Sequence, residues 1–112
     1  MTEVVKKAVE CVQEMVNKEQ NEKEKYLNTV KGLGSMIIQN GLYGTILFLM
    51  VKKQDKIIEH IDKLIEVQTG VKNFSALVKE GEVQRNTEYF KRQYAALEGV
   101  KWLRRYADIY LG

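Results

Sequence analysis

The sequence predicts an all-α fold, a compact single-domain bundle of five to six helices around a hydrophobic central helix, occupying residues 1–112. Apolar residues recur at spacings of three and four, the period of an amphipathic helix, and no segment shows the sustained alternation of a half-buried strand. β-branched residues fall at the same helical steps. A chain of this length buries about two-thirds of its surface on folding, so a core can form without disulfides.

The first predicted helix begins at Thr2, a suitable N-cap, with Glu3 in its first turn. Its apolar face repeats at helical spacing and consists of Val5, Ala8, Val9, Val12, Met15 and Val16. The polar stretch NKEQNEKEK, residues 17–25, marks the turn out of this helix or a frayed continuation of it.

Two apolar helices are predicted on either side of an Asn-Gly pair. In the first, apolar residues at steps of four, three and four form the buried stripe: Tyr26, Val30, Leu33 and Ile37. Asn40-Gly41 is a suitable end, because both residues tolerate the left-handed conformation that closes a helix. The second helix, residues 42–51, is apolar on every side until Lys52-Lys53.

The glycine-rich stretch GLGSMIIQNGLYGTILFLMV, residues 32–51, contains no charged residue and raises three other interpretations. A membrane span needs about twenty apolar residues, whereas the run from position 41 onward offers eleven. A dinucleotide-binding loop requires a preceding strand and a third glycine where Ile37 stands. The sequence GLYG matches the backbone clamp of a KH domain only in its glycines, because no basic residue or strand accompanies it.

The interpretation that remains is a helix buried at the centre of the bundle, since a helix that is apolar all round belongs there. We expect Leu47 and Phe48 to lie in the core, so that alanine at either position costs about 2 to 5 kcal/mol. We also expect Gly41 and Gly44 to let neighbouring backbones approach closely.

The second half of the chain predicts three more helices. Asp55 is a candidate cap for the first of them, which ends at Gly70. Its buried stripe consists of Ile57, Ile58, Ile61, Leu64 and Ile65. A short helix over residues 75–80 stops at Gly81. The last helix runs from about residue 83 to residue 110 and is rich in aromatic residues.

One cysteine and one histidine leave little room for a metal site or a nucleophilic centre. A zinc site needs three or four such ligands, so we expect no metal, and we expect no cofactor. Cys11 lies on the apolar face of its helix, whereas His60 falls between Glu59 and Asp62 on a polar face. We therefore expect a packed thiol and a solvated imidazole. The N-terminal residues lack the pattern of a secretory signal peptide, a charged region followed by an apolar one, so we expect a cytoplasmic protein.

Positive charge gathers in the C-terminal helix, and all four arginines lie within residues 82–112. On a helical wheel Lys101, Arg104 and Arg105 share one narrow arc with Asp108, beside Glu98. The apolar residues that cover the rest of the wheel are Val100, Trp102, Leu103, Tyr106, Ala107, Ile109 and Tyr110. Such a basic ridge is either a solvated face or a set of phosphate contacts.

Two aromatic residues, Phe90 and Tyr94, lie nearer the start of the same helix, on the face that carries the basic ridge further along. Either the buried face shifts near Gly99, or an aromatic edge stays exposed for a partner.

A second basic cluster, Lys52, Lys53 and Lys56, is a candidate to join the ridge. With three phosphate contacts to a single strand, the logarithm of the binding constant falls against the logarithm of salt concentration with a slope of roughly −2. So few contacts imply weak binding by one molecule. A nucleic-acid role would therefore require several copies, each adding to an effective concentration that the assembly already supplies.

Two segments at opposite ends of the chain, LGSMIIQNGLYGTILFL and LEGVKWLRRYA, resemble the small helical subunit of type III-B CRISPR effector (Cmr) complexes. Members of that family pair an LPxxIxxNGL…FL segment with a closing WLKRxA segment. Gly34 stands where the family often has proline, and Arg104 replaces the usual lysine and keeps the charge. The resemblance spans roughly residues 26–110.

The resemblance implies an all-helical subunit that is not an enzyme and that stacks in several copies along the inner side of a ribonucleoprotein filament. The larger subunits hold the guide RNA and cut the target RNA, and the small subunit helps to hold the target strand. The matched segment supports Arg104 and Arg105 as RNA contacts, whereas Lys101, Lys52, Lys53 and Lys56 come from charge placement. Expected partners are other Cmr-complex subunits, copies of this chain and the guide and target RNA, with no membrane and no small-molecule substrate.

Two rival functions remain. One is a helical protein-protein adaptor with no nucleic-acid role, whose basic ridge binds an acidic protein surface. The other is a small all-α enzyme in which Arg85, Glu88 and Arg105 converge on one cavity to stabilise anionic chemistry.

Overall fold

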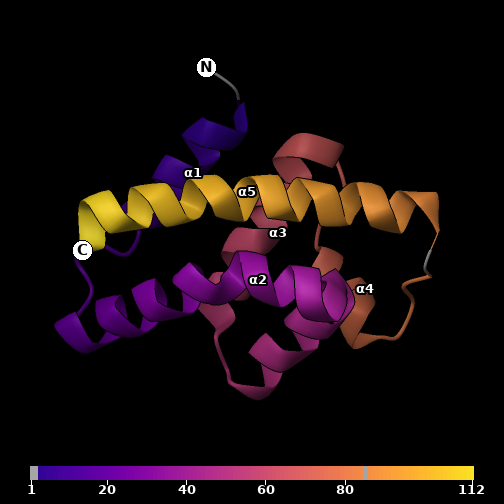
Figure 1. Cartoon of the computed structure of the whole chain (residues 1–112), viewed down its shortest axis with the longest axis horizontal. Helices are drawn as coiled ribbons and strands as arrows, with labels where there is room; N and C mark the ends of the chain where they lie inside the picture. Colours follow the sequence, from indigo (N-terminus) through magenta and orange to yellow (C-terminus); the bar gives the residue numbers. More distant parts are fainter. Residues whose placement is uncertain (1–2, 85) are drawn as a thin grey trace.

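The computed structural model describes residues 3–84 and 86–112, and every regular element among them is a helix. The five helices are α1 (Glu3–Gln13), α2 (Gln20–Val51), α3 (Asp55–Thr69), α4 (Phe74–Lys79) and α5 (Thr87–Leu111) (Figure 1). The all-α prediction is therefore confirmed. The predicted N-cap Thr2 lies outside the described residues.

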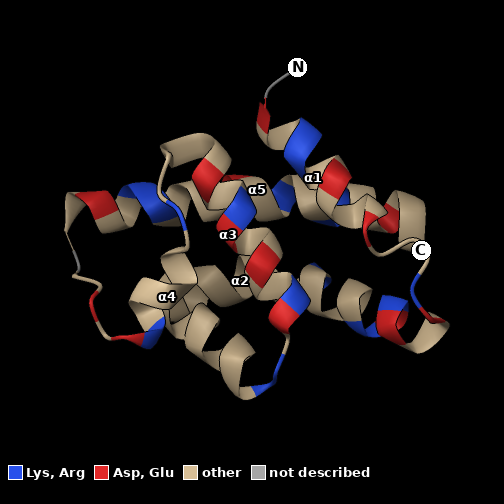
Figure 2. Cartoon of the chain, turned by 180° about the vertical axis from the view of Figure 1, so that it is seen from behind, with Lys and Arg blue, Asp and Glu red and all other residues tan. Residues whose placement is uncertain are grey.

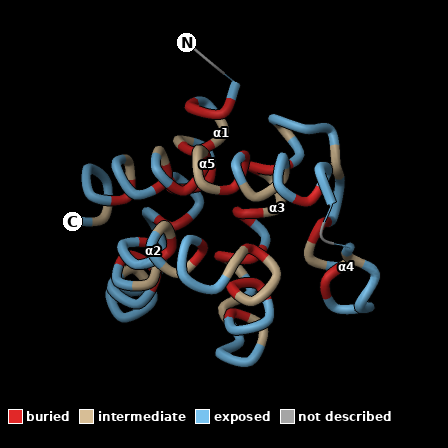
Figure 3. Tube along the Cα trace, turned by 45° about the vertical axis from the view of Figure 1, so that its right-hand side comes forward, coloured by how far each residue is buried: buried red, intermediate tan, exposed pale blue. Residues whose placement is uncertain are grey.

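The helices are arranged around α3, which contacts each of the other four. α5 crosses the front of the molecule in Figure 1 and packs on α1, α2 and α3. The buried parts of the chain face this shared interior (Figure 3). The Cα radius of gyration is 13.1 Å, close to the value of about 13 Å for a compact chain of about 100 residues.

The second part of α2, residues 42–51, is called the distal arm, and it is not the central helix. Its inner side is fully buried through Leu42, Thr45, Ile46 and Leu49. Its outer side is not, because Leu47 is 39% exposed, Phe48 44% and Val51 77%. The predicted core positions of Leu47 and Phe48 are therefore wrong. Apolar character allows a helix to be buried, but only the packing of other elements can cover it.

A bend at Gly41 divides α2, and it confirms the predicted break between two apolar helices. Gly41 has φ 75° and ψ 164°, a conformation that is open almost only to glycine. It is extended rather than left-handed, so the next residues start a new helical segment whose first N–H groups lack helical partners. Leu42 N donates to Gln93 Oε1 at 2.8 Å, and Tyr43 N donates to the Tyr89 hydroxyl at 3.0 Å. Side chains of α5 therefore cap the distal arm.

α2 is also long and apolar enough to cross a membrane, judged by length and composition alone, with a mean hydropathy of 1.4 in its most apolar window. Core helices of soluble proteins meet the same criterion. Here α2 sends fully buried side chains into the core on both sides of its bend: Leu33, Ile37, Leu42, Ile46 and Leu49.

Glycines end α3 and α4 as expected. Gly70 caps α3 in the left-handed conformation with φ 79°, and Gly81, after α4, has φ 71°. Asp55 is the first residue of α3 rather than its cap, which is Gln54. α5 begins later than predicted, where the Asn86 side chain accepts a hydrogen bond from Tyr89 N at 3.0 Å.

Only some of the apolar residues on the helical wheel of α5 are buried. Ile109 and Tyr110 are exposed, whereas Val100, Leu103 and Ala107 lie in the core. The upstream aromatic edge stays exposed rather than turning inward. Tyr94 is 73% exposed and Phe90 40%. α5 therefore presents apolar as well as basic side chains to the outside.

α5 packs closely on α3 at Gly99. A Cβ atom at Gly99 would lie 2.7 Å from the Cβ of Leu64, closer than real side chains approach. At Gly44, by contrast, a Cβ would make only ordinary contact with Asn40 of its own helix, so the predicted close approach there is wrong. Gly41 is needed for its backbone conformation, with the Tyr89 hydroxyl 3.1 Å from where a Cβ would stand.

A buried polar network joins α2 and α3 to the turn after α1. His60 is fully buried, so the expected solvated imidazole is wrong. Its Nδ1 lies 2.7 Å from the Tyr26 hydroxyl, and its Nε2 lies 2.9 Å from Glu14 Oε1. A neutral imidazole satisfies both contacts, with Nδ1 accepting from the Tyr26 O–H and Nε2–H donating to the carboxylate. The polar neighbours of His60 in sequence did not reveal these distant partners.

Cys11 fits the expected packed thiol. It is fully buried, and burial raises the pKa of its thiol to about 12. The thiol therefore stays protonated near neutral pH and is a poor nucleophile.

We expect Leu49→Ala to lower the free energy of unfolding by about 2 to 5 kcal/mol, because it empties a fully buried site. Leu47→Ala on the outer side of the same arm is the matched control. It should cost at most about 1 kcal/mol, because that side chain is already partly in water. Urea denaturation of both variants measures the difference. Equal losses would mean that the arm is buried on both sides.

Acid should weaken the fold through Glu14 and His60. Burial acts to raise the pKa of Glu14, but hydrogen bonds from His60 and Lys63 outweigh it and lower that pKa from 4.5 to about 2. Burial lowers the pKa of His60 below 6.5, against the opposing effect of Glu14. Between the folded-state and unfolded-state pKa of each group, the unfolded chain binds more protons than the folded chain does. The free energy of unfolding therefore falls as the pH drops below 6.5, through His60, and falls further between pH 4.5 and about 2, through Glu14.

Glu14→Gln should abolish the part of the acid destabilisation that comes from protonating Glu14, so the free energy of unfolding should decline less steeply below pH 4.5. The matched control is Glu10→Gln on α1, whose carboxylate pairs with Lys7 at the surface. Urea denaturation from pH 2 to pH 7 measures both. An acid limb in Glu14→Gln that matches the unsubstituted chain would contradict the role of this carboxylate.

Candidate nucleic-acid interface

A groove of about 450 Å³ runs between the first part of α2 and the C-terminal half of α5. These two segments lie one above the other in Figure 1. We call it the basic groove, because it is lined by four cationic side chains: Lys31, Lys101, Arg104 and Arg105. The remaining lining residues are uncharged: Val30, Gly34, Ser35, Ile38, Leu97 and Val100.

Helical periodicity places these residues together. Arg104 and Arg105 follow Lys101 by three and four residues, about one helical turn, so the three side chains share one face of α5. On α2, Lys31 and Gly34 are likewise three residues apart. Nothing lies within 4 Å of where a Cβ at Gly34 would stand, so this position leaves the groove open.

The arginines are the cations most available to a ligand. Among the described residues, neither Arg104 nor Arg105 has a carboxylate within ion-pair distance. Lys101 is paired with Glu98 at 2.9 Å, and that contact lowers the pKa of the Glu98 carboxyl. Lys31 lies 3.9 Å from Asp108, a loose and exposed pair that contributes little stability.

Trp102 supports this face rather than offering a free stacking surface. Its Nε1 donates to Glu98 Oε1 at 2.9 Å, and its ring packs partly against the core. Arg105 lies 4.8 Å and Lys101 5.2 Å from the ring centroid. Such cation–π contacts orient the two cations along α5.

The second predicted cluster does not join the basic groove. Lys52 and Lys53 lie in the turn between α2 and α3, at the bottom edge of the molecule in Figure 2. Lys56 bonds two carboxylates, Glu59 at 2.9 Å and Glu14 at 3.4 Å. The structure therefore brings together three of the six predicted contact residues and separates the other three from them.

Lys31 completes the basic groove, and sequence reasoning missed it. It stands in the helix predicted from the apolar stripe at 26–37, on the side away from that stripe. Periodicity marks such a residue as exposed but does not say which neighbouring helix it lies beside. Only the packing of α2 on α5 shows that.

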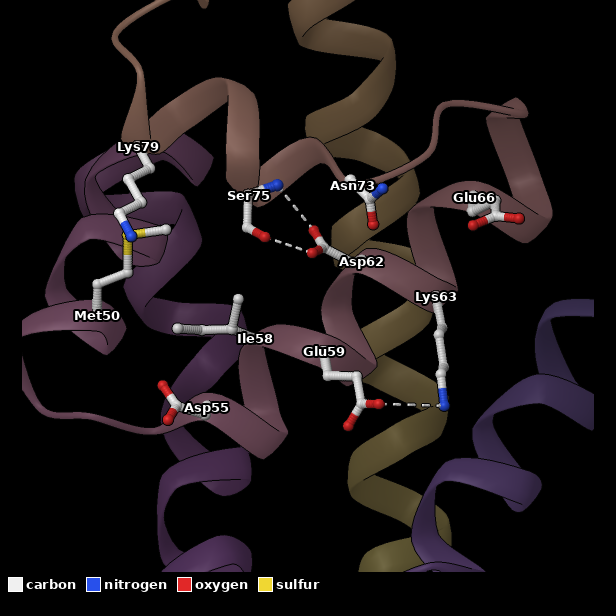
Figure 4. A pocket seen from close by; sticks show the side chains of 10 residues that line it. All are labelled: Met50, Asp55, Ile58, Glu59, Asp62, Lys63, Glu66, Asn73, Ser75 and Lys79. Atoms are coloured by element: carbon white, nitrogen blue, oxygen red, sulfur yellow. Dashed lines mark hydrogen bonds and ion pairs between the residues drawn. The ribbon is translucent and has the colours of Figure 1, made fainter.

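A larger cavity of about 690 Å³ lies between α3 and α4 and has the opposite character (Figure 4). Four carboxylates line it, against two lysines: Asp55, Glu59, Asp62 and Glu66, with Lys63 and Lys79. Asp62 accepts from Ser75 N at 2.9 Å and from the Ser75 hydroxyl, which ties the start of α4 to α3. Burial raises the pKa of Asp62. An excess of carboxylates repels phosphate, so this cavity is unsuited to a polyanion.

Glu14, Glu59 and His60 place ligand atoms within 4.8 Å of one another, the spacing of a metal site. Lys63 bonds Glu14 at 3.1 Å and lies 3.7 Å from Glu59, and Lys56 bonds the same two carboxylates. Two ammonium groups therefore already balance the two carboxylates, and a divalent cation would meet both of them at close range.

The residues proposed for an anionic enzyme site do not converge. Arg105 lines the basic groove, whereas Glu88 lines a separate cavity between α3 and α5. Arg85 lies outside the described residues.

Comparison with known proteins places the chain in a family. A family model described as CRISPR-associated protein (Cas_Cmr5) matches residues 1–110. The chain is 44% identical over 110 residues to the CRISPR system Cmr subunit Cmr5 of Thermotoga maritima, a match that covers 98% of this chain and 83% of that protein. No solved structure gives a significant match. The chain therefore belongs to the Cas_Cmr5 family of CRISPR-associated proteins, as the two sequence segments indicated.

Proposed function

We propose that this protein is the non-catalytic small subunit of a cytoplasmic type III-B CRISPR effector ribonucleoprotein, and that its basic groove helps to hold the target RNA strand. Membership of the Cmr5 family supports a small subunit that assembles with other Cmr components. The observation that carries the RNA role is the basic groove, where Arg104 and Arg105 are exposed and have no carboxylate partner among the described residues.

The affinity for RNA that this groove could provide suits several copies acting together rather than one copy alone. Each phosphate contact to a single strand contributes about −0.7 to the salt slope, so three or four contacts give roughly −2 to −3. One copy would bind RNA weakly at physiological salt. Several copies stacked along one strand would each act at the high effective concentration that the assembly supplies.

A second candidate function is a protein-protein adaptor, and the exposed outer side of the distal arm favours it. Leu47, Phe48 and Val51 form an apolar face that the described residues leave partly exposed, with the Lys52 ammonium 5.7 Å from the centroid of the Phe48 ring. Apolar faces of this kind mark contacts with other proteins. An adaptor without an RNA role would keep its partners after nuclease treatment. A subunit that helps to hold RNA would make such protein contacts and would also help the complex to retain the target strand.

The test is charge reversal of the exposed arginines in the assembled complex. Arg104→Glu with Arg105→Glu should leave thermal unfolding nearly unchanged, at a cost of less than about 1 kcal/mol, because the loss is one exposed cation–π contact. Retention of target RNA should weaken, and its salt dependence should become shallower. The measurement is a salt titration of strand release from complexes that contain the variant.

Lys52→Glu with Lys53→Glu is the matched control, because it makes the same change in charge at two adjacent exposed residues outside the basic groove. It should reduce retention much less. Equal effects of the two double variants would point to general charge rather than to the groove. Unchanged retention with Arg104 and Arg105 reversed would remove the RNA role and leave the adaptor.

A further inference from the structure

A second cavity of different chemistry lies next to the basic groove and shares Ile38 with it. This cavity has a volume of about 620 Å³ and lies where the bend of α2 faces the N-terminal half of α5. Ile38 lines both cavities. We call the second one the amide groove, after its polar lining residues: Gln39, Asn40, Tyr43, Tyr89 and Gln93.

The basic groove has the chemistry to bind the phosphate of a nucleotide, and the amide groove has the chemistry to bind its base. The basic groove carries four cations, whereas the described residues that line the amide groove are all uncharged. Side-chain amides offer paired donors and acceptors that match the edges of nucleobases, and aromatic rings offer surfaces on which unstacked bases lie. A volume of this size is also typical of sites that enclose a small ligand.

Hydrogen bonds to the bend of α2 hold the donors of the amide groove in place. Gln93 uses its Oε1 to accept from Leu42 N, which fixes the side chain and leaves both N–H donors of its amide unused in the described part of the chain. Tyr89 accepts from Tyr43 N and keeps its own O–H to donate. Asn40 is exposed, and its side chain makes no hydrogen bond with a described residue.

The absence of a side chain at Gly41 keeps the amide groove open. A Cβ there would lie 3.1 Å from the Tyr89 hydroxyl and 3.5 Å from Gln93 Oε1, between the two polar groups. At the junction with the basic groove stands Ile38, which is 72% exposed. An aliphatic side chain at this junction suits contact with a ribose or with the face of a base.

We propose that the amide groove is a subsite for one unpaired nucleobase of the strand whose phosphates lie in the basic groove. In this arrangement the amides of Asn40 and Gln93 meet the edge of the base, and Ile38 contacts the sugar between base and phosphate. The inference rests on the proposed RNA role, because it takes the polyanion in the basic groove to be a single strand.

The test uses the full chain labelled with ¹⁵N, in which both backbone amides and side-chain amide groups give separate NMR signals. Two probes of equal charge are titrated at low salt, a single-stranded hexaadenylate and the corresponding abasic ribose-phosphate hexamer. Signals of Lys101 and Arg104 should shift with both probes. The side-chain amides of Asn40 and Gln93 should shift with the hexaadenylate alone, which should bind at least about fivefold tighter.

Asn40→Ala should lower the affinity for hexaadenylate to that for the abasic hexamer while the shifts in the basic groove persist. Asn28→Ala, an exposed asparagine on the same helix and outside both grooves, is the matched control and should change neither affinity. Gln93 is left intact because it caps the distal arm.

Shifts confined to the basic groove, with equal affinity for both probes, would overturn the base subsite and leave the RNA role standing. Shifts of the Asn40 and Gln93 amides with the abasic hexamer as well would also overturn it, because the groove would then bind sugar and phosphate. Shifts in neither groove would remove the RNA role together with the subsite.

Discussion

Two hydrogen bonds from the backbone of α2 to side chains of α5 hold the bend at Gly41, and the positions of the functional surfaces depend on them. The bonds reach Gln93 and Tyr89, and they satisfy N–H groups that the bend removes from the helical ladder. They align the first part of α2 beside the C-terminal half of α5, and so form the basic groove. They also turn the distal arm so that one side enters the core and the other faces outward.

Charge is divided between two sides of one small fold. The net charge is only +3, yet carboxylates gather along α3 and unpaired arginines gather on α5. Lys56 and Lys63 neutralise Glu14 and Glu59 where the turn after α1 meets α3. Arg104 and Arg105, the arginines that the resemblance to Cmr small subunits marks as expected RNA contacts, both line the basic groove. In the proposed function, such a subunit would bind a strand weakly as a single copy and more strongly as one of several copies on the same strand.

Periodicity and glycine placement predicted most of the fold, because both act over a few residues. The buried stripes of the first part of α2 and of α3, the break at Gly41 and the end of α3 at Gly70 were confirmed. The errors concern contacts between distant residues. His60 was expected in solvent because its partners Tyr26 and Glu14 are 34 and 46 residues away. Hydropathy could not reveal that Leu47 and Phe48 are left partly exposed, or that Lys31 lines the same groove as Arg104 and Arg105.

The close approach of α5 to α3 at Gly99 limits what this position can tolerate. A methyl group there would overlap Leu64, so any larger residue would have to displace that side chain or push the two helices apart. Because α3 contacts every other helix, such a displacement would disturb the packing of the whole core.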